Sequence, residues 1–358
     1  MRATSNQPLA SRGLVHMVAA GAVLLLSTAA PVFAQSLTGA GATFPYPIYS
    51  KWFDAYKQKT GVEINYQSIG SGAGIQQVKA GTVDFGASDA ALSNTALKDM
   101  PRKIVHVPTV AGAVVMAYNL PGFTAELKLT PELISGIYMG KITTWNDPKM
   151  AKANPGVTLP PAPILPVHRS DGSGTTNIYT TYLSLVSTDW KELVGAGTAV
   201  SWPAGVGGKG NDGVAGVVKQ TPGAIGYVEL AYAKQNQLPF ASIMNKSGKF
   251  VVANTTSTTA ALAASAASLA KDVRNPIANS AGPDVYPICG LTFLLVYQDS
   301  KDAAKAKTLA DFLDWAIHDG QGFAEDLDYA KLPDAVVKVD EAAIKSLTAA
   351  GKPVLAAR

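Results

Sequence analysis

The architecture of this chain is set by two apolar stretches, VAGAVVMAY at residues 110–118 and ICGLTFLLVY at residues 288–297. Both are rich in β-branched residues and glycine, a pattern typical of buried strands. Because they lie far apart in the sequence, we interpret them as strands that cross between two lobes, which makes one lobe discontinuous. The predicted lobes are lobe I from residues 35–112 plus 288–358 and lobe II from residues 113–287.

Helix and strand patterns alternate around these stretches. The 358 residues fit two domains of about 150 residues each, and strands alternating with helices predict the α/β class. Tyr49, Trp52, Phe53 and Tyr56 form one apolar helical face, and Gly61 is placed to end that helix. The other predicted elements are strands at 62–66 and 83–87, and helices near 75–80, from Thr130, at 178–186, at 253–271 (preferred over a linker) and at 309–317.

The N-terminus has the pattern of a secretory signal. Arg2 and Arg12 precede an apolar run at 17–30, and small or compact residues end at Ala34. This predicts a signal peptide at residues 1–34, cleaved after Ala34. A membrane anchor is the less favoured alternative, because the run is shorter than the roughly 20 residues needed to span a bilayer.

Composition limits the classes of partner. Charged residues make up 16% of the chain, and loss of Arg2 and Arg12 lowers the formal net charge from +4 to +2. Without clustered Lys and Arg, no nucleic-acid groove is expected, and any anion site must be local. The single Cys289 cannot form an internal disulfide, which suits export to a bacterial periplasm.

Four small-residue turns stand after a strand or before a helix. Three of them offer glycine for close backbone approach, and a turn at a helix start offers unpaired N–H groups with partial positive charge. Together with one Arg they suit a dehydrated tetrahedral anion, which must recover many hydrogen bonds. For any one turn alone, helix capping is the favoured alternative. The four turns are 39–44 (GAGATF), 70–74 (GSGAG), 87–90 (ASDA) and 169–175 (RSDGSGT).

Asp89 is the unexpected residue in this set, because an anion site should avoid a carboxylate. An acceptor makes sense if the ligand carries its own proton, as phosphate does near neutral pH and sulfate does not. A carboxylate facing sulfate would leave an acceptor unpaired, at about 1–3 kcal/mol or more, and such sites can reject the analogue that lacks the proton. The alternative is that Asp89 caps a helix beginning near Ala91.

Arg169 can meet phosphate with two charge-assisted hydrogen bonds. Asp171 either pairs with Arg169 or caps the helix that Thr175 enters. The neighbouring His168 is not expected to be a ligand, because the histidines never cluster and a metal site lacks a basis. Enzyme motifs also fail: the turn at 70–74 is not Gly-x-Ser-x-Gly, and Gly208-Lys209 is not followed by Ser or Thr.

These turns resemble the periplasmic phosphate-binding proteins of the bacterial phosphate-specific ABC transporter. The resemblance runs from about Ser36 to Leu355, nearly the whole mature chain, and assigns no role to the loop at 209–213. The segments that carry it are LTGAGATFP at 37–45, VDFGASDA at 83–90, DGSGT at 171–175, GGKGNDG at 207–213, PGAIGY at 222–227 and DLDYA at 326–330.

The resemblance implies the type II periplasmic-binding-protein fold, in which two α/β lobes joined by a two-strand hinge close over the ligand. It implies that Asp89 accepts the ligand's proton and that Asp171 supports Arg169. The implied phosphate-binding residues come from both lobes: Thr43 and Phe44 (largely by backbone N–H), Ser71 and Asp89 from lobe I, and Arg169, Ser173, Gly174 and Thr175 from lobe II.

The implied function is a non-catalytic, monomeric binding protein without cofactor. It would deliver inorganic phosphate to the permease subunits of an ABC importer driven by a cytoplasmic ATPase. Arsenate, molybdate or sulfate as the ligand, a secreted phosphatase, and a signalling or adhesion role are the alternatives. Asp89 argues against the fully ionised anions but not against arsenate.

Overall fold

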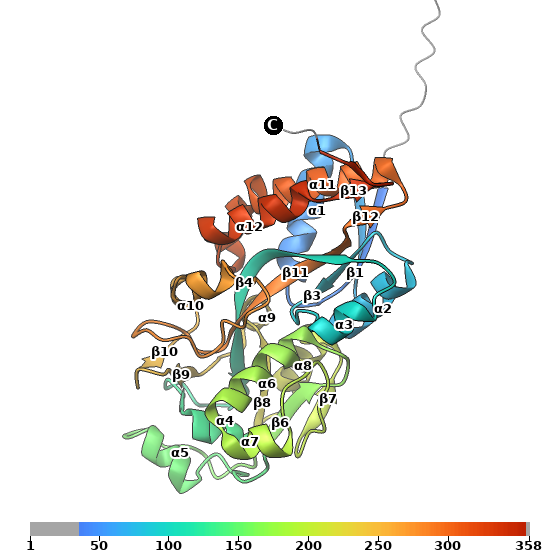
Figure 1. Ribbon diagram of the computed structural model, residues 1–358. Helices are drawn as coiled ribbons and strands as arrows, with labels where there is room; N and C mark the ends of the chain where they lie inside the picture. The colour runs from blue at the N-terminus through green and yellow to red at the C-terminus, as the bar shows by residue number, and fades with distance from the viewer. Residues whose placement is uncertain (1–35, 356–358) are drawn as a thin grey trace, which may run out of the picture. The chain divides into compact units, whose positions relative to one another are not determined.

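The computed structural model describes residues 36–355 (Figure 1). The predicted signal peptide lies outside the described residues. Among the helices that are described, none has the length and hydropathy needed to cross a bilayer.

Strands and helices alternate along most of the described chain. The strands are β1 (Ser36–Gly41), β2 (Glu63–Ser68), β3 (Phe85–Ser88), β4 (Ile104–Tyr118), β5 (Lys128–Leu129), β6 (Leu165–Arg169), β7 (Val206–Gly208), β8 (Ala224–Glu229), β9 (Ser242–Met244), β10 (Phe250–Val251), β11 (Cys289–Tyr297), β12 (Asp299–Ser300), β13 (Thr348–Ala349) and β14 (Lys352–Pro353). The helices are α1 (Tyr46–Thr60), α2 (Ser71–Ala80), α3 (Asn94–Lys98), α4 (Pro131–Tyr138), α5 (Pro148–Ala153), α6 (Gly174–Val186), α7 (Thr188–Leu193), α8 (Gly210–Gln220), α9 (Leu230–Gln235), α10 (Thr255–Leu269), α11 (Ala303–Ile317), α12 (Asp334–Lys345) and the 3₁₀ turns η1 (Asp319–Phe323) and η2 (Glu325–Leu327).

The long strand β4 joins two groups of strands in the order β2-β1-β3-β11-β4-β8-β6-β7. Its first part, through Ala113, pairs with β11, and its second part, from Val114, pairs with β8. We call the part built on β2, β1, β3, β11 and the start of β4 the first lobe. The part built on the end of β4, β8, β6 and β7 is the second lobe (Figure 1).

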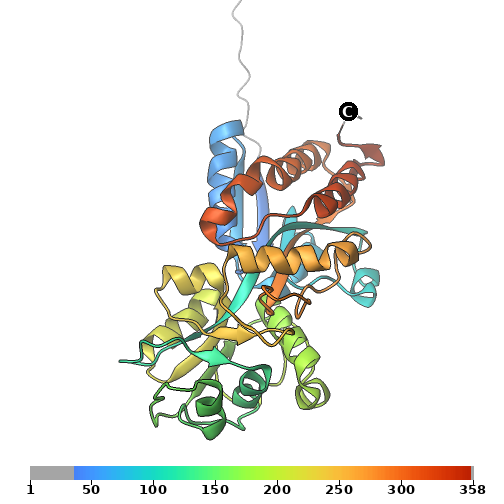
Figure 2. The ribbon, with the colours of Figure 1, turned by 90° about the vertical axis from the view of Figure 1, so that its left-hand side faces the viewer.

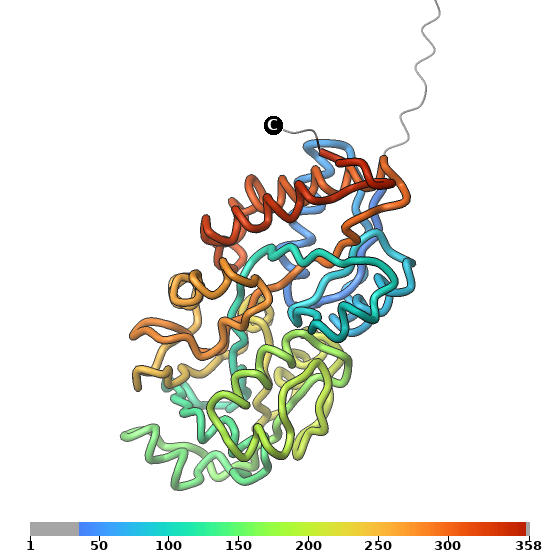
Figure 3. The backbone as a smooth tube through the Cα atoms, in the orientation of Figure 1, coloured from blue at the N-terminus to red at the C-terminus, as the bar shows by residue number. Residues whose placement is uncertain are grey.

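The two apolar stretches are buried strands, as the sequence predicts. Only β4, among the described strands, pairs in both lobes. The chain returns from the second lobe to the first just before β11, not within it. Cys289, the first residue of β11, already pairs with Ala113 of the first lobe, while the carbonyl of the preceding Ile288 accepts the N–H of Val114. Figure 3 traces both passages, blue-green in β4 and orange before β11.

The first-lobe core contains the predicted aromatic face of α1. Tyr49, Trp52, Phe53 and Tyr56 are all buried, and the ring of Phe53 lies 5.7 Å from that of Phe312 on α11. Gly61 ends the helix with φ 75°, and its N–H bonds the carbonyl of Lys57. A left-handed residue at this position favours glycine, which has no Cβ.

Several predicted boundaries differ from the structure. The strand expected at 62–66 is β2, Glu63–Ser68, and the helices expected at 178–186 and 309–317 begin earlier, at Gly174 and Ala303. The helix expected near residues 75–80 begins at Ser71, because its glycine-rich first turn lacks the apolar spacing that identifies a helix. The strand expected at 83–87 runs from Phe85 to Ser88. The Ala/Ser/Thr-rich segment is a helix, α10, as predicted, and it contacts both α12 and β4 (orange in Figure 2).

Candidate functional site

The four turns lie where strands end. β1, β2 and β3 run parallel, so the turns that follow them, at Thr43, Ser71 and Asp89, lie along one edge of the first-lobe sheet. In the second lobe, Arg169 is the last residue of β6, and Ser173 caps α6. Ligands of open α/β sheets commonly bind beyond the carboxyl ends of strands, and this topology puts the predicted residues there.

Direct contacts join the turns of the two lobes. The hydroxyl of Ser71 accepts the N–H of Gly174 at 3.0 Å, and Gly72 N–H donates to the carbonyl of Gly172 at 2.9 Å. Gly174 lies so near Asp89 that a Cβ added to it would be 2.5 Å from Asp89 Oδ2. The predicted residues of both lobes therefore form one interlobe site.

Asp89 is an acceptor within this site. Its side chain is buried, and Thr292 Oγ1 donates to Oδ1 at 2.8 Å. Burial raises the pKa of Asp89 to about 7, although Thr292, Arg169 and Ser71 oppose the rise. The alternative that Asp89 caps a helix is wrong: the next helix, α3, begins at Asn94, and its cap is Ser93.

The buried Arg169 forms a bidentate pair with the partly buried Asp171. Arg169 Nε donates to Asp171 Oδ1 at 2.7 Å, and Nη2 donates to Oδ2 at 2.6 Å. Partial burial alone would raise the pKa of Asp171, but the hydrogen bonds and charge of Arg169 outweigh it and hold that pKa below its usual value. Asp171 thus pairs with Arg169 and does not cap α6, whose cap is Ser173. The edge of the guanidinium opposite Nε is the one left to meet an anion.

Backbone donors complete the site. The N–H groups of Thr43, Phe44, Ser71 and Thr175 have no acceptor among the described residues. Ser71 and Thr175 stand in the first turns of α2 and α6, where N–H groups lack intrahelical partners. These four groups, the hydroxyls and Arg169 form a donor-rich environment around the carboxylate of Asp89.

Sequence reasoning missed the residues that hold these groups in place. Tyr232 Oη donates to the carbonyl of Thr43, and Tyr329 Oη donates to that of Phe44, both at 2.6 Å. Asn211 Nδ2 donates to the hydroxyls of both Thr43 and Thr175. The sequence does contain a signal for Thr292. It is a hydroxyl residue within the apolar stretch at 288–297, where the other hydroxyl residue, Tyr297, stands at the end.

The described residues contain no group of three or more His, Cys, Asp or Glu that could hold a metal ion. His106 Nε2 accepts the N–H of Leu92 at 3.0 Å, and burial lowers its pKa to about 4, so it is neutral and structural. His168 stacks on Trp202 with ring centroids 4.8 Å apart.

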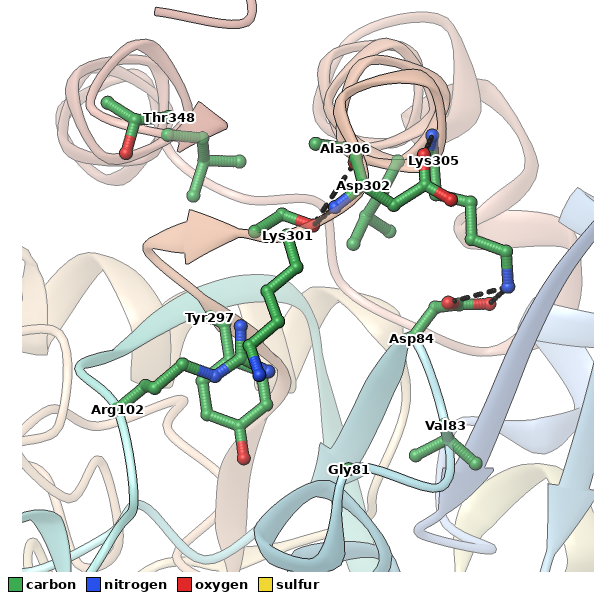
Figure 4. Close-up of a pocket in the computed structure, with 13 residues that line it drawn as sticks. Gly81, Val83, Asp84, Arg102, Tyr297, Lys301, Asp302, Lys305, Ala306 and Thr348 are labelled. Carbon is green, nitrogen blue, oxygen red and sulfur yellow. Dashed lines mark hydrogen bonds and ion pairs between the residues drawn. The ribbon is translucent and has the colours of Figure 1, made fainter. Parts of the chain in front are cut away.

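A separate pocket of about 160 Å³ lies in the first lobe (Figure 4). None of the predicted site residues lines it. Two of its three cations have partners: Lys305 Nζ pairs with Asp84 at 2.9 Å, and the guanidinium of Arg102 lies 3.6 Å from the ring centroid of Tyr297. The third cation, Lys301, also lines the pocket.

Comparison with known proteins agrees with this architecture. The family model described as PBP superfamily domain matches residues 27–319. A phosphate-bound high-affinity periplasmic phosphate-binding protein, PfluDING, aligns with a TM-score of 0.67 at 22% identity, covering 86% of this chain and 93% of that one. A putative phosphate ABC transporter substrate-binding protein from Clostridium perfringens aligns with a TM-score of 0.60 at 18% identity, covering 84% of this chain and 100% of that one. The class is thus the two-lobed periplasmic-binding fold.

Curated relatives narrow the class to a family. The phosphate-binding protein PstS of Pasteurella multocida is 46% identical over 326 residues, 91% of this chain and 94% of that protein. PstS of Haemophilus influenzae is 45% identical over 316 residues, which cover 88% of this chain and 94% of that protein. This chain belongs to the PstS family of phosphate-binding proteins.

Proposed function

We propose that this protein is the substrate-binding component of a phosphate ABC importer. It binds inorganic phosphate between its lobes in the periplasm and delivers it to the permease subunits, while a separate cytoplasmic ATPase supplies the energy. The family assignment supports this role, because its relatives are named phosphate-binding proteins.

One observation carries the choice of ligand: the buried carboxylate of Asp89 lies among donors from both lobes. The donors suit the oxygens of a tetrahedral anion. The carboxylate suits its O–H, which phosphate and arsenate carry and sulfate lacks. Sulfate would place a charged oxygen against Asp89 and leave a buried acceptor unpaired, at about 1–3 kcal/mol.

The proposed ligand contacts follow the chemistry of each group. Backbone N–H groups are donated by Thr43, Phe44, Ser71 and Thr175. The N–H of Gly174 becomes a further donor if the hydroxyl of Ser71, which accepts it here, turns to the ligand instead. Arg169 gives the guanidinium edge that Asp171 does not use, so Asp171 fixes which edge faces the anion. The hydroxyls of Thr43, Ser71, Ser173 and Thr175 complete the donor set.

The proposed lobe division is 35–112 plus 288–358 and 113–287, after removal of residues 1–34 as a signal peptide. The change of pairing partner within β4 between Ala113 and Val114 supports the first boundary. A ligand that contacts both lobes favours the closed arrangement over an open one, because only the closed state offers all contacts at once.

Titration calorimetry in phosphate-free buffer tests the ligand. We expect tight one-to-one binding of phosphate, competition by arsenate, and binding of sulfate weaker by at least about a hundredfold. Equal affinity for sulfate and phosphate would contradict the role given to Asp89, and absence of phosphate binding would contradict the proposed function.

We also propose that the protein does not catalyse a reaction on its ligand. Incubation with a chromogenic phosphoester separates a binding protein from a phosphatase: we expect no release of the chromophore above the buffer rate. Turnover that scales with protein concentration and is inhibited by phosphate would favour the phosphatase instead.

A further inference from the structure

The amide side chain of Asn211 connects the two lobes at the site. Asn211 is fully buried in the first turn of α8. Its Nδ2 donates to Thr43 Oγ1 of the first lobe at 2.8 Å and to Thr175 Oγ1 of the second lobe at 3.1 Å. Its Oδ1 accepts the backbone N–H of Glu229 at 2.9 Å.

The orientation of this amide is fixed by its surroundings. The N–H of Glu229 can only donate, so the oxygen of Asn211 must face it and the NH₂ group must face the two hydroxyls. A rotated amide would place two donors against each other. Asn211 is therefore a donor to both threonines.

The hydroxyl oxygens of both threonines are occupied as acceptors. A hydroxyl has two lone pairs and one hydrogen. Thr43 Oγ1 accepts from the backbone N–H of Asn211 at 3.2 Å as well as from Nδ2. Thr175 Oγ1 accepts from Arg169 Nη1 at 3.4 Å as well as from Nδ2. Each hydroxyl has only its hydrogen left to offer.

We propose that Asn211 is a positioning residue that fixes the hydroxyls of Thr43 and Thr175 as donors to the bound anion. It holds Thr43 only when the lobes meet, because Thr43 belongs to the first lobe, whereas Asn211 and Thr175 both belong to the second. The inference rests on the proposed function and deepens it. Asn211 preorganises the donor set, so that Asp89 is the acceptor left for a ligand O–H.

This role gives a function to the loop at 209–213, and it differs from a general structural role. If Asn211 only stabilised the fold, its loss would weaken ligand binding by the same factor whether or not Thr43 has a hydroxyl. If it acts through Thr43, the two losses are coupled.

A double-mutant cycle measures the coupling, with phosphate affinity from titration calorimetry as the readout. The variants are Asn211→Ala, Thr43→Val and the pair. We expect Asn211→Ala to weaken phosphate binding about tenfold or more in the wild-type background, and at least threefold less than that in the Thr43→Val background, where no Thr43 hydroxyl remains to be oriented.

Asn245→Ala is the matched control. Asn245 is also a buried asparagine: its Nδ2 donates to the carbonyls of Gly282, Pro283 and Val285. None of these residues belongs to the site. We expect Asn245→Ala to lower the melting temperature and to leave phosphate affinity within twofold of wild type.

If Asn211→Ala does not fold, Asn211→Asp replaces it in the cycle. This variant keeps an oxygen for the N–H of Glu229 but turns an acceptor toward both hydroxyls. Its added charge acts in both backgrounds and cancels in the comparison. A smaller loss in the Thr43→Val background supports the inference.

The inference would be overturned by equal losses of affinity in both backgrounds, or by an unchanged affinity in Asn211→Ala. In either case, phosphate binding by the wild-type protein would leave the proposed function standing. A wild-type protein that does not bind phosphate would overturn both.

Discussion

The carboxylate of Asp89 is subject to two opposing effects, stabilisation of its charge by nearby donors and destabilisation of that charge by burial. It lies among donors, which suits an ionised acceptor, but its burial raises its pKa to about 7. The hydrogen bond from Thr292 and the charge of Arg169 lower that pKa but do not offset burial. A carboxylate in this position is therefore held near the point of protonation and is sensitive to whatever occupies the site.

Asp89→Asn should reduce the discrimination between phosphate and sulfate. The amide removes the negative charge that repels sulfate and can donate to it, so the ratio of the two dissociation constants should fall by about tenfold or more. Titration calorimetry with each anion measures this ratio. Asp340→Asn is the control, because Asp340 is a buried aspartate on α12 outside the site. An unchanged ratio in Asp89→Asn would remove Asp89 from the selectivity.

The same substitution should change stability in a pH-dependent manner. The ordinary pKa of 3.8 rises to about 7 in the fold, so the folded state binds more protons than the unfolded chain between these values. Ligand-free wild type therefore loses stability as pH rises from about 4 to 7. The gain in melting temperature from Asp89→Asn should be small at pH 4 and full at pH 8. Scanning calorimetry without phosphate checks this, and a gain that shrinks toward pH 8 would show the sign to be wrong.

At the scale of elements, the start of α6 is a close approach between the lobes. Ser173 caps the helix by accepting Thr176 N–H at 3.0 Å. The next residue, Gly174, meets Asp89 and the hydroxyl of Ser71. A glycine here is required by close approach and not by its backbone angle, because any Cβ would enter the space of the first lobe.

Gly174→Ala should weaken phosphate binding by ten- to about a hundredfold, as expected for overpacking of about 1–3 kcal/mol. Gly216→Ala on α8 is the matched control, because a Cβ there meets nothing within 4 Å. It should leave affinity unchanged and stabilise the fold by up to about 1 kcal/mol through helix propensity. Calorimetry and urea unfolding provide the two readouts. Wild-type affinity in Gly174→Ala would mean that this contact does not form in the bound state.

At the scale of the whole molecule, the two lobes share β4 and meet through the turns of the site. The bond from Gly72 N–H to the carbonyl of Gly172 and the bond between Asn211 and Thr43 both cross between them. Other contacts between the lobes include the bond from Tyr232 Oη to the carbonyl of Thr43 and the packing of Ile178 against Gly290. A ligand that contacts both lobes adds its own contacts in the closed arrangement only, so it can shift an equilibrium between open and closed arrangements through its differential affinity.

Small-angle scattering should report a smaller radius of gyration after phosphate is added to the wild-type protein. The reason is that phosphate contacts both lobes only when they are closed. Gly174→Ala should show little or no decrease at the same phosphate concentration. If the wild-type radius is the same with and without phosphate at saturating concentration, the proposed closure does not occur.

The sequence by itself determined the local features of this protein. Apolar periodicity predicted α1, because burial of one helical face has a period that is visible in one segment. Apolar runs rich in β-branched residues and glycine predicted the strands of residues 110–118 and 288–297. Turn composition and the resemblance together predicted Ser71, Asp89, Arg169 and Gly174, which the structure brings to the interlobe site, but not the buried Asn211 that bonds both Thr43 and Thr175. The glycine-rich start of α2 was missed, because its residues carry no such period.

Only the tertiary structure decided how distant residues act on one another. Sequence left Asp89 and Asp171 as possible helix caps, and the fold gave Asp89 the hydroxyl of Thr292 and Asp171 the guanidinium of Arg169. Asn211 had no assigned role until the fold put it between Thr43 and Thr175. The physical reason is that hydrogen bonds depend on positions in space, and these partners, apart from the Arg169–Asp171 pair, lie tens to hundreds of residues apart in the chain.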